Sequence, residues 1–403
     1  METNEYTNHP HLGLIPSDWV VTNSSAVCTK ITDGTHDTPT PTSSGLPYIK
    51  SVHIKKGTIT FESSLFLSKE DHDIIYKRCN PEKGDLLVVN IGLGNIGECA
   101  YVDVDFEFSM KNIALLKPNP KRLDGKYLYY YYESRKNRVV HATKTGGAQP
   151  FLSIKDLKKL KLVVPPLPEQ RKIAEILSTW DKAITTTEKL IETSKQQKKA
   201  LMQQLLTGKK RLVNPDTGKV FEGEWEEVHL SDIAGIKKGK ALSAKNVVDG
   251  SFPVIAGGKT SPYNHNQFTH SEIITVSASG SYAGYVSYHP YKIWASDCSV
   301  VSTRVGNDIG FIFQWLQLNQ NRIYSLQSGG AQPHIYPKDL EVLKLLKPKL
   351  NEQKKIASVL TVADKEIEIL TAKLAHFKQE KKALMQQLLT GKRRVKIDEV
   401  EVA

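Results

Sequence analysis

Cysteine, methionine and long apolar runs are scarce in this chain of 403 residues, which has four cysteines and four methionines. Cys28, Cys79, Cys99 and Cys298 show neither a Cys-x-x-Cys pair nor a Cys/His spacing, so the sequence predicts no zinc site and no disulfide framework. No apolar run approaches the roughly 20 residues of a membrane span, and the polar start METNEYTNHP is unlike a signal peptide. We therefore expect a soluble, cytoplasmic protein with buried thiols and no membrane contact.

Catalytic motifs are also missing. GLGNIG at 92–97 resembles a dinucleotide-binding fingerprint, but that motif requires a helix next, and the ECAYVDVDFEF that follows alternates like a strand. Pro215-Asp216 resembles the start of a nuclease motif, yet no acid-x-Lys element follows it, and VNPDTGKVF is typical of a turn. No Asn-Pro-Pro-Tyr motif of an amino-methyltransferase occurs. The sequence thus predicts no catalytic residue, no metal site and no cofactor in the chain itself.

What the sequence has instead is a repeat. KKALMQQLLTGK occurs at 198–209 and again at 381–392, which is 183 positions later. The same offset maps GGAQP at 146–150 onto GGAQP at 329–333. Between these matches the sequences diverge, so the chain alternates a variable block with a repeated arm. The predicted boundaries are 1–154 (block), 155–212 (arm), 213–337 (block), 338–395 (arm) and 396–403 (tail).

Each arm is predicted to be one long helix of a coiled coil. Its apolar residues recur at alternating steps of four and three over about five heptads, which is a 3.5-residue period. The rhythm also passes through Lys198 and Lys381, and each run stops at Thr-Gly-Lys, where glycine suits a left-handed cap. The apolar positions expected to pack helix on helix, or to dock a subunit, are Ile173, Leu177, Trp180, Ile184, Ile191, Leu201, Leu205, Ile356, Leu360, Ile367, Leu370, Leu374, Phe377, Leu384 and Leu388.

The simplest partner of one arm is the other arm, packed antiparallel. Both blocks carry a strand, a glycine-rich turn and a strand, in GDLLVVNIGLGNIGECAYV and EIITVSASGSYAGYVSY, so the two blocks are expected to share a backbone geometry. The tyrosine run at 127–132 fits a helix packed on a sheet better than a platform for unpaired bases. The predicted fold class is a tandem of two mixed α/β (α+β) domains separated by two long antiparallel coiled-coil helices, with pseudo-two-fold symmetry.

The net charge of +12 suggests a nucleic acid or another acidic partner. The excess lies in the arms, which hold 14 Lys and Arg each against 6 and 7 acidic residues. The blocks are balanced, with 17 basic against 17 acidic residues in the first and 9 against 10 in the second. If the blocks bind DNA, we expect them to do so through local patches.

This order of segments resembles the specificity (S) subunit of type I DNA restriction-modification systems. The openings IPSDWVVTNSSAVCTKITDGTHDTP and WEEVHLSDIAGIKKG, the two glycine hairpins, and the helix starts PPLPEQRKIAEIL and NEQKKIASVL carry the resemblance over nearly the whole chain. It implies a DNA reader without activity of its own, in which each block is a target recognition domain for one half of a split sequence. It also implies that the helices dock two modification (methyltransferase) subunits, which carry S-adenosylmethionine. A restriction subunit that uses ATP and Mg can join such a complex.

Loop residues are the candidate contacts to double-stranded DNA. Lysines would hold phosphates, while Asn, Gln, Ser and His could reach base edges, although each could instead be an ordinary solvated residue. Gln149 and Gln332 lie in the shared GGAQP, so they either clamp backbone or a common base, or simply shape the turn into the arm. The candidates are Gly34, Thr35, His36, Lys50, Asn90, Asn95, Lys144, Gln149, Lys237, Lys238, Lys240, Lys259, Ser279, Ser281, Tyr282 and Gln332.

The arms also predict a spacing. About 38 helical residues at about 1.5 Å each give about 57 Å, which equals about 17 base pairs and is an upper limit on half-site separation. We expect two half-sites roughly one helical turn apart on one face of the duplex.

Two other classes of function stay open. One is a fused methyltransferase or nuclease, against which the missing motifs argue; methylation by the purified chain alone would indicate it. The other is a coiled-coil scaffold or a DNA-binding protein without a restriction role. A gel shift without sequence preference, even with a modification subunit present, would favour the scaffold.

Overall fold

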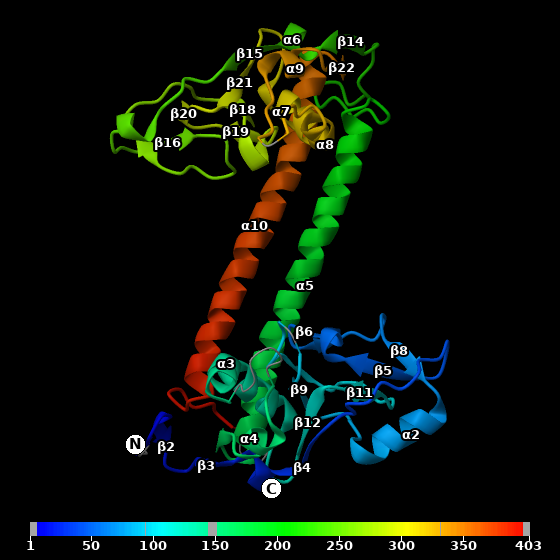
Figure 1. Ribbon diagram of the computed structural model, residues 1–403. Coiled ribbons are helices and arrows are strands. Elements are labelled where there is room, and N and C mark those ends of the chain that lie inside the picture. Colours follow the sequence, from blue (N-terminus) through cyan, green and yellow to red (C-terminus); the bar gives the residue numbers. More distant parts are fainter. Residues whose placement is uncertain (1–5, 93, 144–150, 331, 398–403) are drawn as a thin grey trace. The chain divides into compact units, whose positions relative to one another are not determined.

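The chain forms two compact units, each with one variable block and part of both long helices (Figure 1). The first unit comprises residues 1–186 and 374–403, and the second residues 187–373. The long helices are α5 (Leu167–Leu205) and α10 (Leu350–Leu388), each of 39 residues. The computed structural model describes residues 6–92, 94–143, 151–330 and 332–397.

The two larger sheets of the first block have four and three strands. An antiparallel sheet has the strand order β10-β9-β12-β4, and a second sheet has the order β11-β5-β8, with β11 and β5 parallel. Leu86 and Val88 of β9 join one apolar cluster, while Leu87 and Val89 join another, so this strand is buried on both faces. That explains its unbroken apolar sequence. The strands are β4 (Cys28–Asp33), β5 (Leu46–Lys50), β8 (Leu65–Leu67), β9 (Leu86–Val89), β10 (Cys99–Tyr101), β11 (Ser109–Lys111) and β12 (Ile113–Pro118).

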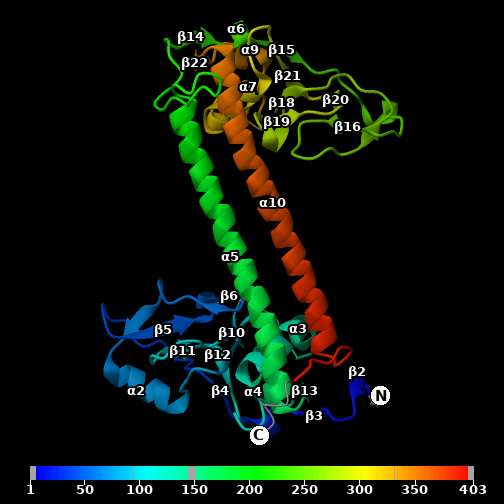
Figure 2. The same ribbon diagram turned by 180° about the vertical axis from the view of Figure 1, so that it is seen from behind.

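Helix α3 (Gly125–Thr143) packs on the antiparallel sheet of the first block (Figure 2). Tyr127, Tyr130, Tyr131 and Tyr132 are buried in the same cluster as Leu86 of β9. The tyrosine run is therefore core, as predicted, and its rings are not a platform for bases. The other helix of ten or more residues in this block, α2 (Lys69–Arg78), begins after Ser68, whose hydroxyl accepts a hydrogen bond from the backbone of Asp71.

The second block repeats this plan within its own unit. Its antiparallel sheet has the order β15-β21-β18-β19, its second sheet has the order β17-β16-β20, and α7 (Ile309–Leu318) takes the place of α3. Each predicted glycine hairpin is present, as β9 with β10 and as β18 with β19. The strands are β15 (Ala234–Lys238), β16 (Phe252–Ile255), β17 (Asn264–His265), β18 (Ile273–Ser277), β19 (Val286–His289), β20 (Trp294–Ala295) and β21 (Cys298–Thr303).

The first dozen residues of each predicted arm fold with the block. In the first unit α4 (Ile154–Lys158) is followed by β13 (Lys161–Val164), which pairs with β3 (Val20–Asn23). In the second, α9 (Pro337–Glu341) is followed by β22 (Lys344–Lys347), which pairs with β14 (Glu226–His229). The long helices thus begin at Leu167 and Leu350, because backbone pairing with the start of the block takes up the residues before them.

The remaining elements are short. They are β1 (Tyr6–His9), β2 (Gly13–Pro16), β6 (Ile54–Lys55), β7 (Thr58–Ile59), α1 (Ser24–Val27), α6 (Leu230–Ile233), α8 (Gln320–Tyr324) and the 3-10 turns η1 (Ser51–His53), η2 (Ala244–Asn246) and η3 (Gly280–Tyr282).

The apolar stripe of the long helices faces inward. None of the 15 predicted packing positions is exposed; Ile173, Leu177, Ile356 and Leu360 have at most 1% of their surface accessible. In the first unit the Trp180 ring meets Phe377 edge to face at 5.6 Å. This contact joins α5 to α10, so the predicted packing of one arm on the other is confirmed there.

Ion pairs between α5 and α10 occur twice, once in each unit. Lys381 Nζ lies 2.5 Å from Asp181 Oδ1 in the first unit, and Lys198 Nζ lies 2.5 Å from Asp364 Oδ1 in the second. The 183-residue offset relates one pair to the other, because it maps Asp181 onto Asp364 and Lys198 onto Lys381. The lysines that interrupt the apolar rhythm are therefore interhelical ion pairs, which fix which residues of the two helices face each other.

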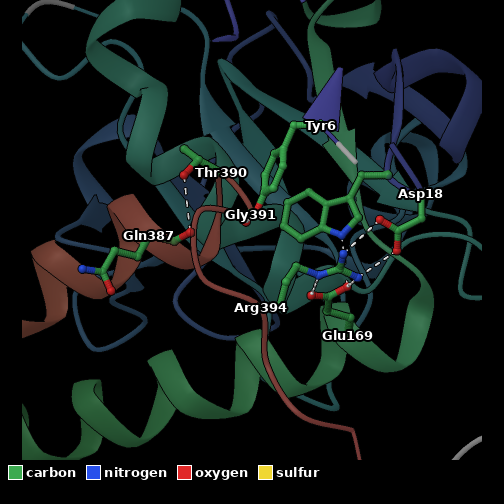
Figure 3. A network of polar contacts seen from close by, with 8 residues as sticks. Tyr6, Asp18, Glu169, Gln387, Thr390, Gly391 and Arg394 are labelled. Atoms are coloured by element: carbon green, nitrogen blue, oxygen red, sulfur yellow. Dashed lines mark hydrogen bonds and ion pairs between the residues drawn. The ribbon is translucent and has the colours of Figure 1, made fainter. Parts of the chain in front are cut away.

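A second duplicated pair lies at the end of each arm. Arg394 donates from Nε and Nη2 to the two carboxylate oxygens of Glu169, at 2.7 and 2.8 Å, and Arg211 donates to Glu352 in the same way, at 2.6 and 2.7 Å. Together with the lysine pairs, these contacts run in opposite directions along the two helices within each unit, as an antiparallel pair requires. Figure 3 shows the first of them beside Asp18.

Candidate nucleic-acid interface

Three chain segments of the first block meet where strands of its antiparallel sheet begin or end, a place that we call the sheet edge. Asp33 at the end of β4 pairs with Ala114, and Val89 at the end of β9 pairs with Ile113, at the start of β12. The loops that follow β4 and β9 and the turn that precedes β12 therefore emerge together. The candidate contacts of the first block are concentrated in these loops.

The loop after β4 is held by its backbone. The Gly34 N–H donates to the Ile113 carbonyl at 2.9 Å and the Thr35 N–H to the Met110 carbonyl at 3.0 Å. A Cβ on Gly34 would lie 2.1 Å from the Met110 carbonyl oxygen, so only glycine fits at this close approach. The hydroxyl of Thr35 accepts from the backbone of Asp37. Gly34 and Thr35 thus shape the loop.

Beside this loop lies a shallow hollow of about 410 Å³. His36 and Asn112 form its polar wall, with His36 Nδ1 3.1 Å from Asn112 Oδ1. Lys50 is the register partner of Lys111 on the neighbouring parallel strand, which brings a second cation next to it. The residues that line the hollow are His36, Ile91, Lys111, Asn112 and Phe151.

The second block has the same backbone frame at its own sheet edge. The Gly239 N–H donates to the Cys298 carbonyl at 2.8 Å and the Lys240 N–H to the Ala295 carbonyl at 2.8 Å, matching the bonds of Gly34 and Thr35. A Cβ on Gly239 would lie 2.4 Å from the Ser296 carbonyl oxygen, so this glycine is equally constrained. The frame predicts which residues of the two blocks correspond, although their sequences diverge.

Cations and aromatic rings surround the edge of the second block. Lys240 Nζ lies 5.1 Å from the centre of the Trp294 ring, and Lys259 Nζ lies 5.2 Å from that of Tyr282. Such a lysine is held near the surface by its ring while its ammonium group stays available to an anion. Ser279 donates to the Asp297 carboxylate.

The structure separates the predicted DNA contacts by exposure. Thr35 and Asn90 are 7% and 3% exposed, so their side chains belong to the interior and do not fit the predicted role at a DNA surface. Asn95 is half-buried and its amide donates to the Ser51 carbonyl at 2.7 Å, which braces the glycine turn. Lys144 and Gln149 lie outside the described residues. The exposed candidates are His36, Lys237, Lys238, Lys240, Lys259, Ser281, Tyr282 and Gln332, and the half-buried ones include Lys50 and Ser279.

Several residues at these edges were not among the predicted contacts. Lys111, Asn112 and Phe151 line the hollow of the first block, while Asp297 and His334 take the corresponding places in the second. The sequence repeat could have indicated two of these residues, because Phe151 and His334 directly follow GGAQP, at the point where the two copies stop being identical. Nothing in the sequence marks Asn112 or Asp297, which become neighbours of the β4 or β15 loop only through sheet pairing.

The described thiols and acidic groups show neither a reactive thiolate nor a metal-binding cluster. Burial raises the pKa of the Cys28, Cys79 and Cys298 thiols to about 12, which keeps them protonated at neutral pH. Among the residues the structure describes, no group of three or more His, Cys, Asp or Glu side chains could hold a metal ion. No described helix is long and apolar enough to cross a membrane.

Comparison with known proteins identifies the family. The model of the type I restriction modification DNA specificity domain matches residues 16–195 and again 222–379. The chain belongs to the type I DNA specificity family. Each of the two matches spans one block and most of the long helix that follows it, so the family domain and the sequence repeat coincide.

Relatives of the same kind span nearly the whole chain. A putative type I restriction enzyme MjaX specificity subunit of Methanocaldococcus jannaschii is 29% identical over 411 residues, covering 96% of each chain. The MjaVIII specificity subunit of the same organism is 27% identical and covers 87% of this chain and 86% of its own. The crystal structure of a type I restriction-modification S subunit from M. genitalium has a TM-score of 0.68 at 19% identity, over 92% of this chain and 96% of that one. This last likeness supports the fold of this specificity-family chain.

Proposed function

We propose that this chain is the DNA-reading subunit of a type I restriction-modification complex, without catalytic activity of its own. Each block reads one half of a split double-stranded DNA sequence. The observation that carries the proposal is the pairing of one backbone frame with two sets of side chains. Gly34 and Gly239 hold the same bonds at the two sheet edges, while the residues that surround them differ. A duplicated reader for two different half-sites requires this combination.

The long helices are the proposed docking surface for two modification subunits. Their second halves carry the identical KKALMQQLLTGK, and each arm has 14 basic residues against 6 or 7 acidic ones. Identical surfaces suit two identical partners, and the cationic excess suits acidic protein surfaces or flanking DNA. S-adenosylmethionine, ATP and Mg belong to the partner subunits in this proposal, the last two to a restriction subunit that joins the complex.

The helices also set the spacing between half-sites in this proposal. Inserting seven residues at matching positions of α5 and α10 preserves the apolar rhythm and adds about 10.5 Å, or about three base pairs. The unread spacer of the target should lengthen accordingly. A spacer of unchanged length in a complex that still methylates would show that the helices do not act as a ruler.

The proposed function is tested by expressing the chain with its modification subunit in a host that lacks adenine methylation. Methylated adenines are then mapped across the host genome. We expect one bipartite motif, two short specified parts with an unspecified spacer, and no methylation by either subunit alone. A continuous motif, or methylation by the modification subunit without this chain, would contradict the proposal.

A further inference from the structure

The two blocks carry different side chains on the same backbone frame, and the frame shows which residue of one block corresponds to which residue of the other. Two residues separate Met110 from Ile113 in the first block, and two separate Ala295 from Cys298 in the second. Because the flanking carbonyls accept the same bonds in both blocks, Lys111 corresponds to Ser296 and Asn112 to Asp297.

The opposite wall of the hollow corresponds in the same way. Ile91 forms an isolated bridge with Phe151, and Ser279 forms one with His334. The next residues repeat this relation, since the Leu152 N–H donates to the Asn90 carbonyl at 2.8 Å and the Ile335 N–H to the Ala278 carbonyl at 2.9 Å. The hollow of the first block and the site around Asp297 are therefore one structural position with different side chains.

The charges at this position differ between the blocks. The first has a lysine and an amide, at Lys111 and Asn112, whereas the second has a carboxylate, at Asp297, and a hydroxyl, at Ser296. Asp297 does not fit a phosphate contact, because phosphates repel a carboxylate, and the neighbouring Ser296 side chain is buried. Phosphate contacts also carry no sequence information, whereas base edges differ in their donors and acceptors.

We propose that this position reads base identity, through Lys111 and Asn112 in the first block and through Asp297 in the second. This rests on the proposed function, because it assumes that the blocks bind the major groove. Lys111 and Asn112 offer N–H donors, which match the acceptor atoms of purines. Asp297 offers only acceptors, which match the exocyclic amino group of cytosine or adenine.

Local geometry presents these groups. Asn112 has a left-handed backbone with φ of 58°, which asparagine and aspartate tolerate better than other residues. His36 Nδ1 lies next to Asn112 Oδ1, so the amide nitrogen of Asn112 points away from the ring. Lys111 donates to the Thr38 hydroxyl and keeps two further N–H donors. Ser279 in turn binds the Oδ2 atom of Asp297, which fixes the carboxylate.

The test exchanges the two side chains between the blocks. Asn112→Asp and Asp297→Asn each change one atom of nearly unchanged shape, and both residues tolerate the backbone at position 112. Each variant is expressed with the modification subunit, and methylated adenines are mapped. Glu224→Gln is the matched control, because it removes the same charge at an exposed site before β14.

Each variant should alter the base preference at one position of one half-site. A change of roughly ten- to hundredfold is expected for the loss of a good base contact. The other half-site and the spacer should stay as in the wild type, and Glu224→Gln should leave the whole motif unchanged. Melting curves confirm that the variants fold. If Asp297→Asn does not fold, Asp297→Ser is used in its place.

Two results would overturn the inference. One is a motif that both folded variants leave unchanged. The other is methylation that falls equally at all sequences, since a residue that acts alike on every base does not read one. A wild-type complex that yields no split motif would refute the proposed function itself, which distinguishes the two failures.

Discussion

Arg394→Ala tests how the end of the chain is joined to its beginning in the first unit. The Glu169 side chain is 1% exposed, and its carboxylate accepts from Arg394 at 2.7 and 2.8 Å and from Trp19 Nε1 at 3.0 Å (Figure 3). Hydrogen bonds to Glu169 raise the pKa of the Arg394 guanidinium above its already high usual value. The Arg394 guanidinium therefore stays charged at neutral pH.

Among the described residues, the variant leaves the buried carboxylate with the indole N–H of Trp19 as its remaining side-chain donor. Removing one partner of a buried ion pair costs about 3–5 kcal/mol, and the lower end applies because the Arg394 side chain is 25% exposed and water can replace it in part. For a unit of this size, about 3 kcal/mol lowers Tm by roughly 6–12 °C.

Calorimetry of the full chain measures the loss, and hydrogen exchange locates it. Arg393→Ala removes the same charge from an exposed neighbour and should change stability by less than about 0.5 kcal/mol. Adding Glu169→Gln to Arg394→Ala should recover part of the loss, because the buried charge is then absent. Exchange should rise around Glu169 and stay unchanged around Glu352, whose own partner is Arg211.

The reasoning is refuted if Arg394→Ala and Arg393→Ala lower Tm equally. It is also refuted if Arg394→Ala lowers the stability more in the Glu169→Gln background than in the wild type. The buried carboxylate would then not be the source of the lost stability.

Three further outcomes are expected. Reversing the charge of either Lys198 or Asp364 should destabilise the second unit, and the double reversal should restore about 1 kcal/mol in denaturant unfolding; strict additivity would exclude the pairing. Gly97→Ala should lower the free energy of unfolding by about 2–5 kcal/mol, because φ is 81° and the new Cβ would lie 2.2 Å from a valine methyl of α3. Gly94→Ala, where φ is 88° and no atom lies near the new Cβ, should lower it by only about 1–2 kcal/mol. Burial lowers the pKa of His289 to about 4. Neutral His289 therefore favours the folded state fully above pH about 6.5, and the free energy of unfolding should fall by up to about 3 kcal/mol as the pH drops toward 4. In unfolding curves measured against pH, His289→Gln should remove this fall.

The sequence by itself determined the repeat, the long helices and the inward face of each. These follow from local rules, because a 3.5-residue apolar rhythm and a terminal glycine act within one helix. It also determined the two glycine hairpins and the buried role of the tyrosine run at 127–132, since short-range alternation and helical spacing both lie within a single segment.

Only the tertiary structure decided which side chains share the sheet edges. Asn90 was predicted as a DNA contact among the loop residues, but it follows the central strand β9 and its side chain is buried. Asn112 and Asp297 drew no attention in the sequence, yet pairing of distant strands puts each beside a glycine loop about 60 to 80 residues earlier. The two blocks have different insertions, so no single offset aligns them. Hydrogen bonds between strands identify the equivalent residues because backbone geometry persists where side chains diverge.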